Sequence, residues 1–443
     1  MWRLSVILFV FLLLQYLLFA QQAQEATPTV QQQWTLQQCI DTAHERNMQI
    51  RQAEFNVQGS KANFNQSKIN FLPSINANLG DGFSFGRSQS REGVYVDESS
   101  NSANASLNLD LMLFQGLRNI NELHAKKYAF LASVEDREKI KKDITLNVIS
   151  YYLNVLIQKE LLNIAAGQIA LTDSMEKHLL LLVASGKEAE VKVYEIRAQR
   201  ATELYNLTEA EMNVRLAMLD LAQILDVKEI AGFDVENPYR GLDITTTLVP
   251  DINFESALAG LPDVRAEEMR LQSARKNLSI AKSYHYPTLS FNAFTSTGYY
   301  YMQDIMNAPF AEQALNNLRN YVGVSLSIPV FNRLTIWTGV RTSKLQMQQQ
   351  ELQLEEAKKT LFKDIQRASL NVSVAQKRYL AADGSVEANS EAYRYIEERY
   401  KSGRATLLEL QQAKTNLEKS LSERVRAKYE FVFGVKILEL YGR

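Results

Sequence analysis

The chain has 443 residues, with 49 Lys or Arg against 50 Asp or Glu, and this near-neutral balance argues against a nucleic-acid-binding protein. Its 46% hydrophobic content argues against wholesale disorder, and its single cysteine, Cys39, excludes an intrachain disulfide and a Cys-based zinc cluster. With only 8 Pro and 18 Gly, turns are scarce, so the elements between them must be long.

Residues 1–20 have the layout of a secretory signal peptide. A short basic start is followed by the almost wholly apolar run Leu4–Phe19, and Ala20 supplies a small residue before a polar stretch. The alternative is an uncleaved membrane anchor. The end of the apolar run has no cysteine, which excludes lipid attachment at that point. Beyond residue 20 no stretch approaches the ~18 apolar residues of a membrane helix. We therefore expect an exported chain that is not a helical membrane protein.

The rest of the chain reads as two copies of one plan, residues 34–226 and 251–441, joined by a linker at 227–250. Leu72-Pro73 corresponds to Tyr286-Pro287 at an offset of 214, and Ser185-Gly186-Lys187 corresponds to Ser402-Gly403-Arg404 at an offset of 217. Each copy predicts a helix, a β-hairpin, a very long helix, a Ser-Gly turn and a last helix. The hairpin, long helix and last helix span 74–114, 116–184 and 187–226 in the first copy, and 288–331, 333–401 and 404–440 in the second.

The strand candidates alternate apolar and polar residues with period 2. In Ser74–Phe85 and Ala103–Leu113 almost every odd position is apolar, whereas the even positions are mostly Asn, Ser and Gly. Tyr321–Val330 alternates in the same way, and Leu289–Tyr301 does so more weakly. The pattern fits a half-buried sheet of a soluble protein, but strands of this length with a small, polar second face fit a membrane barrel better. Four strands cannot close a barrel, and open edges are not tolerated in lipid, so several chains must share one.

The long helices carry a heptad seam. From Leu361 to Tyr400, twelve positions follow strict 4-3 spacing and all but Asn389 are apolar. The equivalent run in the first copy passes through Ile144, Val148, Tyr151 and Val155. A sustained seven-residue repeat implies left-handed supercoiling, and a helix of 65 to 70 residues extends ~100 Å. Such a helix suits a tube or a rod.

Together these features resemble the TolC-type outer-membrane efflux protein family over about Trp34–Tyr441: the signal peptide, the duplicated halves, the prolines that precede the strands, and the Ser-Gly turns. The resemblance implies an α-helical barrel of long coiled-coil helices plus a transmembrane β-barrel, to which each chain of a homotrimer contributes four strands. It implies an exit duct in outer-membrane lipid with a periplasmic extension. Its partners would be a periplasmic adaptor (a membrane fusion protein) and an inner-membrane pump of an efflux or type I secretion system.

The two Ser-Gly turns are the expected adaptor-contact tips. By themselves they predict helix C-caps in which Gly is left-handed. In the family such tips also meet the adaptor, usually through a Val-Gly pair, and here Ser takes the place of that Val. The tip residues are Ser185, Gly186, Lys187, Ser402, Gly403 and Arg404.

The resemblance also implies a periplasmic gate beyond the second tip. Glu409 occupies the place of an acidic ring, and three copies would surround the tunnel axis; the alternative is a solvated helix residue. Gln412 occupies the place of a second acidic position, so the ring is expected to be single. Glu195 is the first-half counterpart and the weaker candidate, because an insertion precedes it.

No catalytic constellation is found, and we expect no enzyme, cofactor or metal site. Cys39 is expected to be a structural thiol, neither acylated nor paired. The segments Arg87–Ser102 and Tyr300–Asn320 are expected to be loops outside the cell, and Tyr299, Tyr300 and Tyr301 to form an interfacial girdle, with core packing as the alternative. The alternative function is a structural or adhesive coiled-coil protein of the cell envelope. Amphipathic hairpins favour the duct, because a rod has no use for them.

Overall fold

The structure, a computed structural model, describes residues 33–89, 93–227, 232–244, 255, 257, 260–302 and 306–442. The predicted signal peptide and part of the 227–250 linker lie outside the described residues. The chain divides into two compact units, and each unit combines segments from both sequence repeats. The first unit comprises Met1–Arg51, Ile140–Ala257 and Phe362–Arg443; the second comprises Gln52–Lys139 and Leu258–Leu361. The helices α4 (Arg118–Ala184) and α9 (Thr335–Lys401), of 67 residues each, contribute to both.

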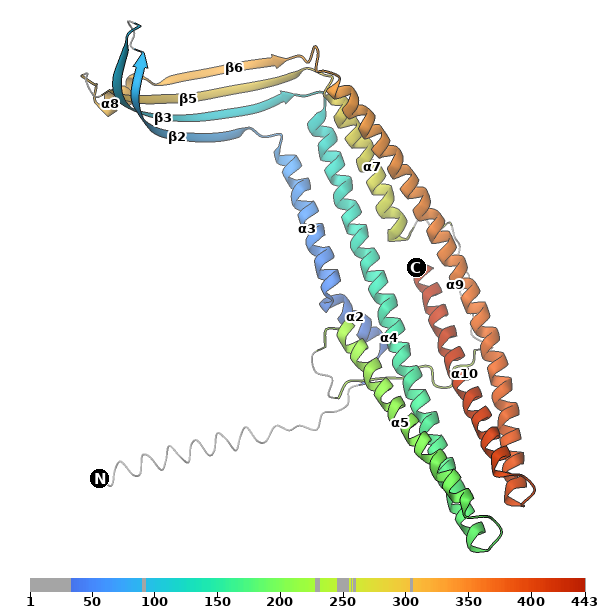
Figure 1. Cartoon of the computed structure of the whole chain (residues 1–443). Helices are drawn as coiled ribbons and strands as arrows, with labels where there is room; N and C mark the ends of the chain where they lie inside the picture. The colour runs from blue at the N-terminus through green and yellow to red at the C-terminus, as the bar shows by residue number, and fades with distance from the viewer. Residues whose placement is uncertain are drawn as a thin grey trace, which may run out of the picture. The chain divides into compact units, whose positions relative to one another are not determined.

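The second unit contains an antiparallel sheet of four strands in the order β2-β3-β5-β6 (Figure 1). The strands are β2 (Ser74–Gln89), β3 (Tyr95–Phe114), β5 (Thr288–Met302) and β6 (Arg319–Ser327). They include most of the four predicted strands, and β2 and β3 extend well beyond the predicted ranges. Strands β2 and β6 form the two edges, and neither edge is paired with another described strand.

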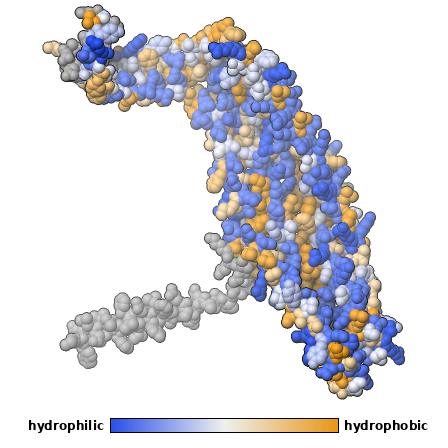
Figure 2. All heavy atoms as spheres, in the orientation of Figure 1, coloured by the Kyte–Doolittle hydropathy of each residue, from blue (hydrophilic) through white to orange (hydrophobic). Residues whose placement is uncertain are grey.

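The register places the apolar positions of all four strands on one face. Leu79 pairs with Ala105 and Ala105 with Thr297; Phe291 pairs with Val324. These rungs are separated by even numbers of residues along each strand, so their side chains share a face. The apolar residues of that face are exposed in the single chain; Leu79 is 85% exposed and Val322 is 70% exposed. The surface view accordingly shows hydrophobic residues on the strands (Figure 2).

The turn from the second strand of each hairpin into its long helix uses left-handed backbone in both repeats. Gly116 and Leu117 have φ of 61° and 62°, and Arg333 and Leu334 have φ of 53° and 62°. The two pairs are 217 residues apart, so the duplication extends to the backbone conformation. Gly116 is required for a second reason, because a Cβ there would lie 2.7 Å from Cβ of Tyr286.

Helices α3 (Met48–Ile69) and α7 (Pro262–Ser283) pack beside α4 within the second unit. Ion pairs connect them to α4. Nη1 of Arg137 lies 2.9 Å from Oε2 of Glu54, and Nη2 of Arg270 lies 2.6 Å from Oδ2 of Asp136. Partial exposure and salt screening limit what each such pair contributes to stability.

The two predicted external segments are more ordered than loops. Most of Arg87–Ser102 belongs to β2 and β3, and Tyr300–Asn320 contains the short helix α8 (Phe310–Asn316). Helix α8 is tied to β5 by side chains: Oγ1 of Thr297 donates to the carbonyl oxygen of Ala314 at 2.7 Å, and Nδ2 of Asn317 donates to that of Gly298 at 2.6 Å. The expectation of loops throughout these segments was wrong, because tertiary contacts with β5 organise the second of them.

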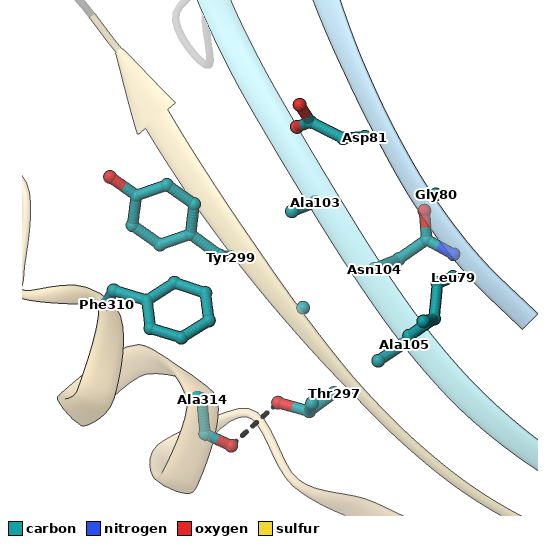
Figure 3. Close-up of a pocket in the computed structure, with 11 residues that line it drawn as sticks. Leu79, Gly80, Asp81, Ala103, Asn104, Ala105, Thr297, Tyr299, Phe310 and Ala314 are labelled. Carbon is teal, nitrogen blue, oxygen red and sulfur yellow. Dashed lines mark hydrogen bonds between the residues drawn. The ribbon is translucent and has the colours of Figure 1, made fainter. Parts of the chain in front are cut away.

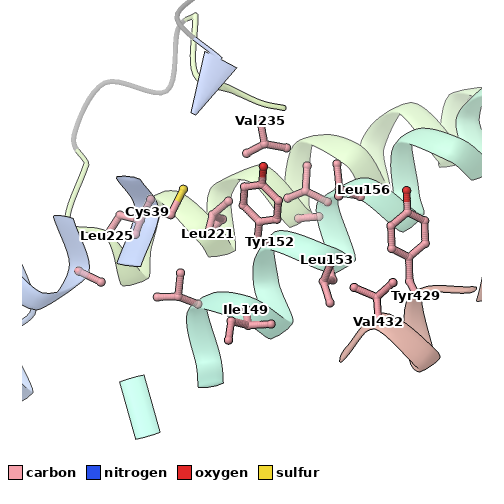
Figure 4. Close-up of a cluster of buried hydrophobic side chains, with 14 of the residues drawn as sticks. Cys39, Ile149, Tyr152, Leu153, Leu156, Leu221, Leu225, Val235, Tyr429 and Val432 are labelled. Carbon is pink, nitrogen blue, oxygen red and sulfur yellow. The ribbon is translucent and has the colours of Figure 1, made fainter. Parts of the chain in front are cut away.

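The first unit is built from helices and one small sheet. Strand β1 (Gln33–Trp34) pairs in parallel with β4 (Asp234–Val235), and the helices are α2 (Leu36–Arg46), α5 (Val191–Ile224), α10 (Leu407–Tyr441) and the remaining parts of α4 and α9. Its main core gathers residues from α2, α4, α5, β4 and α10 (Figure 4). The Tyr152 hydroxyl group donates to the carbonyl oxygen of Glu236 at 2.5 Å, so its burial leaves no unpaired donor.

The seam of α9 lies where the heptads predict it. Nine of its twelve positions are buried: Leu361, Ile365, Ala368, Val372, Ala375, Ala382, Val386, Tyr393 and Tyr400. The equivalent prediction for α4 was wrong at Tyr151, which is 38% exposed, whereas Tyr152 is fully buried. The reason is that α4 packs here against several elements at once, so its buried face is wider than a seam between two helices.

Among the described residues, no helix combines the length and the apolar character needed to cross a membrane.

Candidate functional site: the helix tips and the gate residues

Both Ser-Gly turns have the same capping geometry. Gly186 and Gly403 are left-handed, with φ of 72° and 71°. At the first tip the Lys187 amide donates to the Leu182 carbonyl at 2.9 Å, and the Gly186 amide donates to the Val183 carbonyl at 2.9 Å. The second tip repeats these bonds from Arg404 to Arg399 at 2.8 Å and from Gly403 to Tyr400 at 2.9 Å. The pattern is a Schellman motif, so the predicted glycine C-caps are confirmed.

The serine of each tip has a local role. Oγ of Ser185 donates to the Leu182 carbonyl at 2.9 Å, and Oγ of Ser402 donates to the Arg399 carbonyl at 3.0 Å. The hydroxyl adds a second hydrogen bond to a carbonyl that already accepts the amide of Lys187 or Arg404 in the Schellman motif, so it reinforces the cap. All six tip residues are exposed, and each tip presents one cationic side chain, that of Lys187 or Arg404.

One hydrophobic cluster in the first unit holds the two tips together. It joins the ends of α4 and α5 to the ends of α9 and α10, and its buried members are Met175, Leu179, Val193, Ile196, Tyr393, Tyr400, Leu407, Leu410 and Ala413. The opposite face of α10 is exposed and carries Leu408, Glu409 and Gln412. The cluster therefore fixes which face of α10 can point away from the packed helices.

The structure gives Glu409 a role that the sequence analysis missed. Thr406 is the N-cap of α10, and the two residues form a capping box. The Glu409 amide donates to Oγ1 of Thr406 at 3.2 Å, while Oε2 of Glu409 accepts from the Thr406 amide at 2.6 Å and from its hydroxyl at 2.9 Å. These bonds to the ionised form hold the pKa of Glu409 below its usual range. The Thr-x-x-Glu spacing was the signal that could have revealed it.

The other gate candidates also lie on exposed surface. Glu195 accepts from Nζ of Lys192 at 2.8 Å on the surface of α5, and Nε2 of Gln412 donates to Oδ1 of Asn416 at 3.1 Å along α10. The N-cap of α5, Glu190, makes no side-chain capping bond. The two tips are thus alike up to their glycines and differ in how the next helix begins.

A buried polar cluster that the sequence analysis did not identify lies about one and a half turns beyond Glu409. Nζ of Lys414 on α10 contacts Oε1 of Glu203 on α5 at 2.7 Å and the carbonyl oxygen of Gln168 on α4 at 2.8 Å, and it also donates to the Thr172 hydroxyl group. Oγ1 of Thr172 donates to the other carboxylate oxygen of Glu203 at 2.6 Å. The signal was the 3-4 spacing of Leu407, Leu410, Lys414 and Leu417, which places a lysine in an apolar seam.

Comparison with known proteins gives one consistent result. The family model described as outer membrane efflux protein matches residues 39–226 and 253–432. Toxin and drug export protein A of Aggregatibacter actinomycetemcomitans is 20% identical over 399 residues, covering 90% of this chain and 83% of that protein. Outer membrane protein TolC of Escherichia coli K12 is 23% identical over 407 residues, covering 90% of this chain and 80% of TolC.

A solved structure shows the same fold. A crystal structure of CusC superposes with a TM-score of 0.80 at 16% sequence identity, covering 92% of each chain. The sequence resemblance to TolC-type proteins is therefore confirmed, and the alternative of a structural or adhesive coiled-coil protein is not supported. The chain belongs to the outer membrane efflux protein family and is an outer-membrane efflux channel.

Proposed function

We propose that three copies of the chain close one β-barrel and one helical tunnel, and that this duct passively carries substrates from a periplasmic adaptor and an inner-membrane pump to the exterior. The observation that carries the proposal is the four-stranded sheet, which has an exposed apolar face and two unpaired edges, β2 and β6. Within lipid every backbone donor and acceptor must be paired, so these edges need partners from other copies.

The strand order supports ring closure between copies. Neighbouring strands in β2-β3-β5-β6 are antiparallel, and β2 and β6 therefore run in opposite directions. The β6 edge of one copy can pair in antiparallel fashion with the β2 edge of the next, a head-to-tail contact that closes into a ring. Two copies would give eight strands, an interior that side chains fill, whereas three give twelve and leave a lumen.

We infer that the polar face of the sheet lines that lumen. Asn76, Asn108 and Asn292 belong to it, and Asp110 accepts a hydrogen bond from Nδ2 of Asn292 at 2.7 Å. Alternating apolar-out and polar-in residues are typical of outer-membrane barrels. The apolar face would then contact lipid.

The tips are the proposed adaptor contacts. Their six residues are exposed, and their Schellman geometry presents two rigid turns that one hydrophobic cluster fixes relative to each other. Rigid elements hold a contact surface with less loss of conformational entropy than free loops do. Lys187 and Arg404 add a positive charge to each tip, which favours an acidic or carbonyl-rich partner surface.

Glu409 is the proposed gate residue, and its capping bonds explain why it carries a charge. The capping bonds stabilise the carboxylate form, so three copies would present three ionised groups. A ring of like charges at a narrow aperture attracts cations and raises the barrier to anions.

Site-specific photo-crosslinking in cells tests the duct and its partner together. A photoreactive residue placed at Ser185 or Ser402 is expected to capture a periplasmic protein, while the same residue at Tyr205, an exposed position of α5, serves as the control. Loss of export in a deletion strain, restored by the wild-type gene, is the functional arm. Capture from Tyr205 but from neither tip would contradict the adaptor assignment.

A further inference from the structure

A pocket of about 390 Å³ lies between α8 and the sheet of the second unit (Figure 3). Side chains from β2, β3, β5 and α8 line it, and they are mainly small or apolar: Leu79, Ala103, Ala105, Tyr299, Phe310 and Ala314. The polar contact drawn in Figure 3, from the Thr297 hydroxyl to the Ala314 carbonyl, holds α8 in place. The volume of the pocket falls within the range of roughly 300–1,000 Å³ that is typical of small-molecule sites.

The strand register identifies the face on which the pocket opens. Leu79, Ala105 and Thr297 form one rung, and this rung shares its face with Leu107, Leu109 and Val322. Asn104 belongs to the opposite face, where its Oδ1 atom would lie 2.8 Å from a Cβ added to Gly80. Helix α8 contacts this face through the hydrogen bond from Thr297, while the side chains of Gln313 and Asn317 pair with backbone groups of β5 beyond its last pair with β6.

The pocket has an apolar end and a polar end. Asp81, Ala103 and Tyr299 form the rung next to the apolar one, farther along β5 from α7 and closer to the end of the strand at Met302. The Asp81 carboxylate accepts from Nδ2 of Asn101 at 3.0 Å. Four apolar residues of the segment that contains α8 are more than half exposed: Met306, Phe310, Leu315 and Leu318.

We propose that this pocket binds an acyl chain of an outer-leaflet lipid, with α8 lying at the lipid surface as a clamp over the chain. The proposal rests on the proposed function, in which the apolar face of the sheet contacts lipid. In that function the ends of the strands farthest from the helices, such as the end of β5 at Met302, face the exterior. The small residues Ala103 and Ala105 leave room for a slender chain, and they lie on the same apolar face as Leu107 and Leu109. Asp81 then lies at the end of the pocket that faces the exterior. The aromatic side chains of Tyr299 and Phe310, with ring centroids 5.3 Å apart, form one wall.

Two matched substitutions separate pocket binding from general contact with lipid. Ala105→Leu fills the pocket, whereas Ala293→Leu adds the same side chain to the same face of the sheet, on the rung of Leu109, outside the pocket. Ala314→Leu fills the pocket from the α8 side and guards against a folding defect peculiar to β3. Detergent-purified, delipidated oligomer is titrated with lipid A and, in parallel, with phosphatidylethanolamine, and bound lipid is counted by native mass spectrometry.

The expected result is one saturable lipid A site per chain in wild type and in Ala293→Leu, and about tenfold or greater weakening in Ala105→Leu and Ala314→Leu. Equal lipid A binding by wild type and both pocket variants would overturn the proposal, as would binding of phosphatidylethanolamine alone. Conductance of the same preparations in planar bilayers separates the two claims. A wild-type protein that conducts but has no saturable lipid site refutes the pocket alone, and one that does not conduct refutes the duct.

Discussion

The ammonium group of Lys414 lies 2.7 Å from Oε1 of Glu203, and the two side chains are only 5% and 7% exposed. Lys414 belongs to α10 and Glu203 to α5, so the pair connects the two helices that follow the tips. Gln199 also donates to Oε1 of Glu203, at 2.9 Å, and Thr172 donates to Oε2. Burying two charges is costly, and here the hydrogen bonds offset that cost by satisfying both groups.

Lys414→Met should destabilise the first unit by about 3–5 kcal/mol, because it leaves the Glu203 carboxylate buried without its counter-ion. Lys414→Met combined with Glu203→Met should recover most of that loss, since both charges are then absent. Thermal unfolding followed by circular dichroism in detergent measures both. The control is Arg394→Met, which removes an exposed pair with Glu391 and should change stability by less than about 1 kcal/mol. If Lys414→Met alone were as stable as Arg394→Met, the buried pair would not contribute to stability as argued.

Three variants separate the cap of α10 from the charge at the proposed gate. Thr406→Ala removes the N-cap and should cost about 1 kcal/mol of stability while it keeps the Glu409 charge. Glu409→Gln keeps a side chain that can complete a capping box but removes the charge, so it should reduce cation selectivity and block by trivalent cations. Glu409→Ala removes both.

Bilayer conductance measures selectivity, and hydrogen exchange of the first α10 amides measures the cap. If Glu409→Gln left selectivity and block unchanged in a correctly assembled oligomer, the carboxylate would have a capping role only. The pKa of Glu409 is lowered in the folded chain, so its contribution to stability is complete above the ordinary pKa of a glutamate and is lost as pH falls through the lowered value. Exchange at the start of α10 should therefore accelerate in acid.

Cys39 should be chemically inert in the folded protein. The thiol is fully buried in the first unit, and burial raises its pKa to about 12, so almost no thiolate exists at neutral pH. Maleimide should label Cys39 rapidly after denaturation and hardly at all before it, and Cys39→Ser should leave assembly and export intact. Rapid labelling of the native oligomer would contradict this packing.

Phe294 and Tyr321 should narrow the lumen. Their rings are stacked on the polar face of the sheet with centroids 5.1 Å apart, and the Tyr321 ring covers Gly323, where a Cβ would lie 2.4 Å from the hydroxyl oxygen. Phe294→Ala should therefore raise single-channel conductance. Phe291→Ala is the matched control, because Phe291 lies on the same strand but on the apolar face. Equal effects of the two substitutions would show that the polar face does not line the pore.

The sequence predicts most of the fold because its two periods are strong. Alternation locates β2, β3, β5 and β6, and the heptads locate the seam of α9, since each pattern follows from a single repeated packing direction. Helix α4 shows where this fails: α2, α5, β4 and α10 all pack against it and bury adjacent pairs such as Tyr152 and Leu153, whereas a seam between two helices buries only every third or fourth residue. Helix α8 was missed because it also depends on tertiary contacts: hydrogen bonds from the side chains of Thr297 and Asn317 to backbone groups 17 and 19 residues away hold it against β5.

The site was predictable where chemistry is local. Gly186 and Gly403 follow from helix capping alone, and the Thr406-Glu409 capping box was readable from four residues. The Lys414-Glu203 pair could be suspected only from a charge in an apolar seam, because its partner is 211 residues away. Pocket residues such as Ala105 carry no local signal, since an alanine in a strand is ordinary until a helix covers it.

If each chain supplies a third of one closed barrel, the detergent-extracted protein must be a trimer. The mass of the oligomer tests this most directly. Native mass spectrometry of the detergent-extracted protein should give a species of three chains that persists until the detergent is exchanged for denaturant. A stable single chain, with β2 and β6 unpaired in a lipid-like environment, would contradict the account.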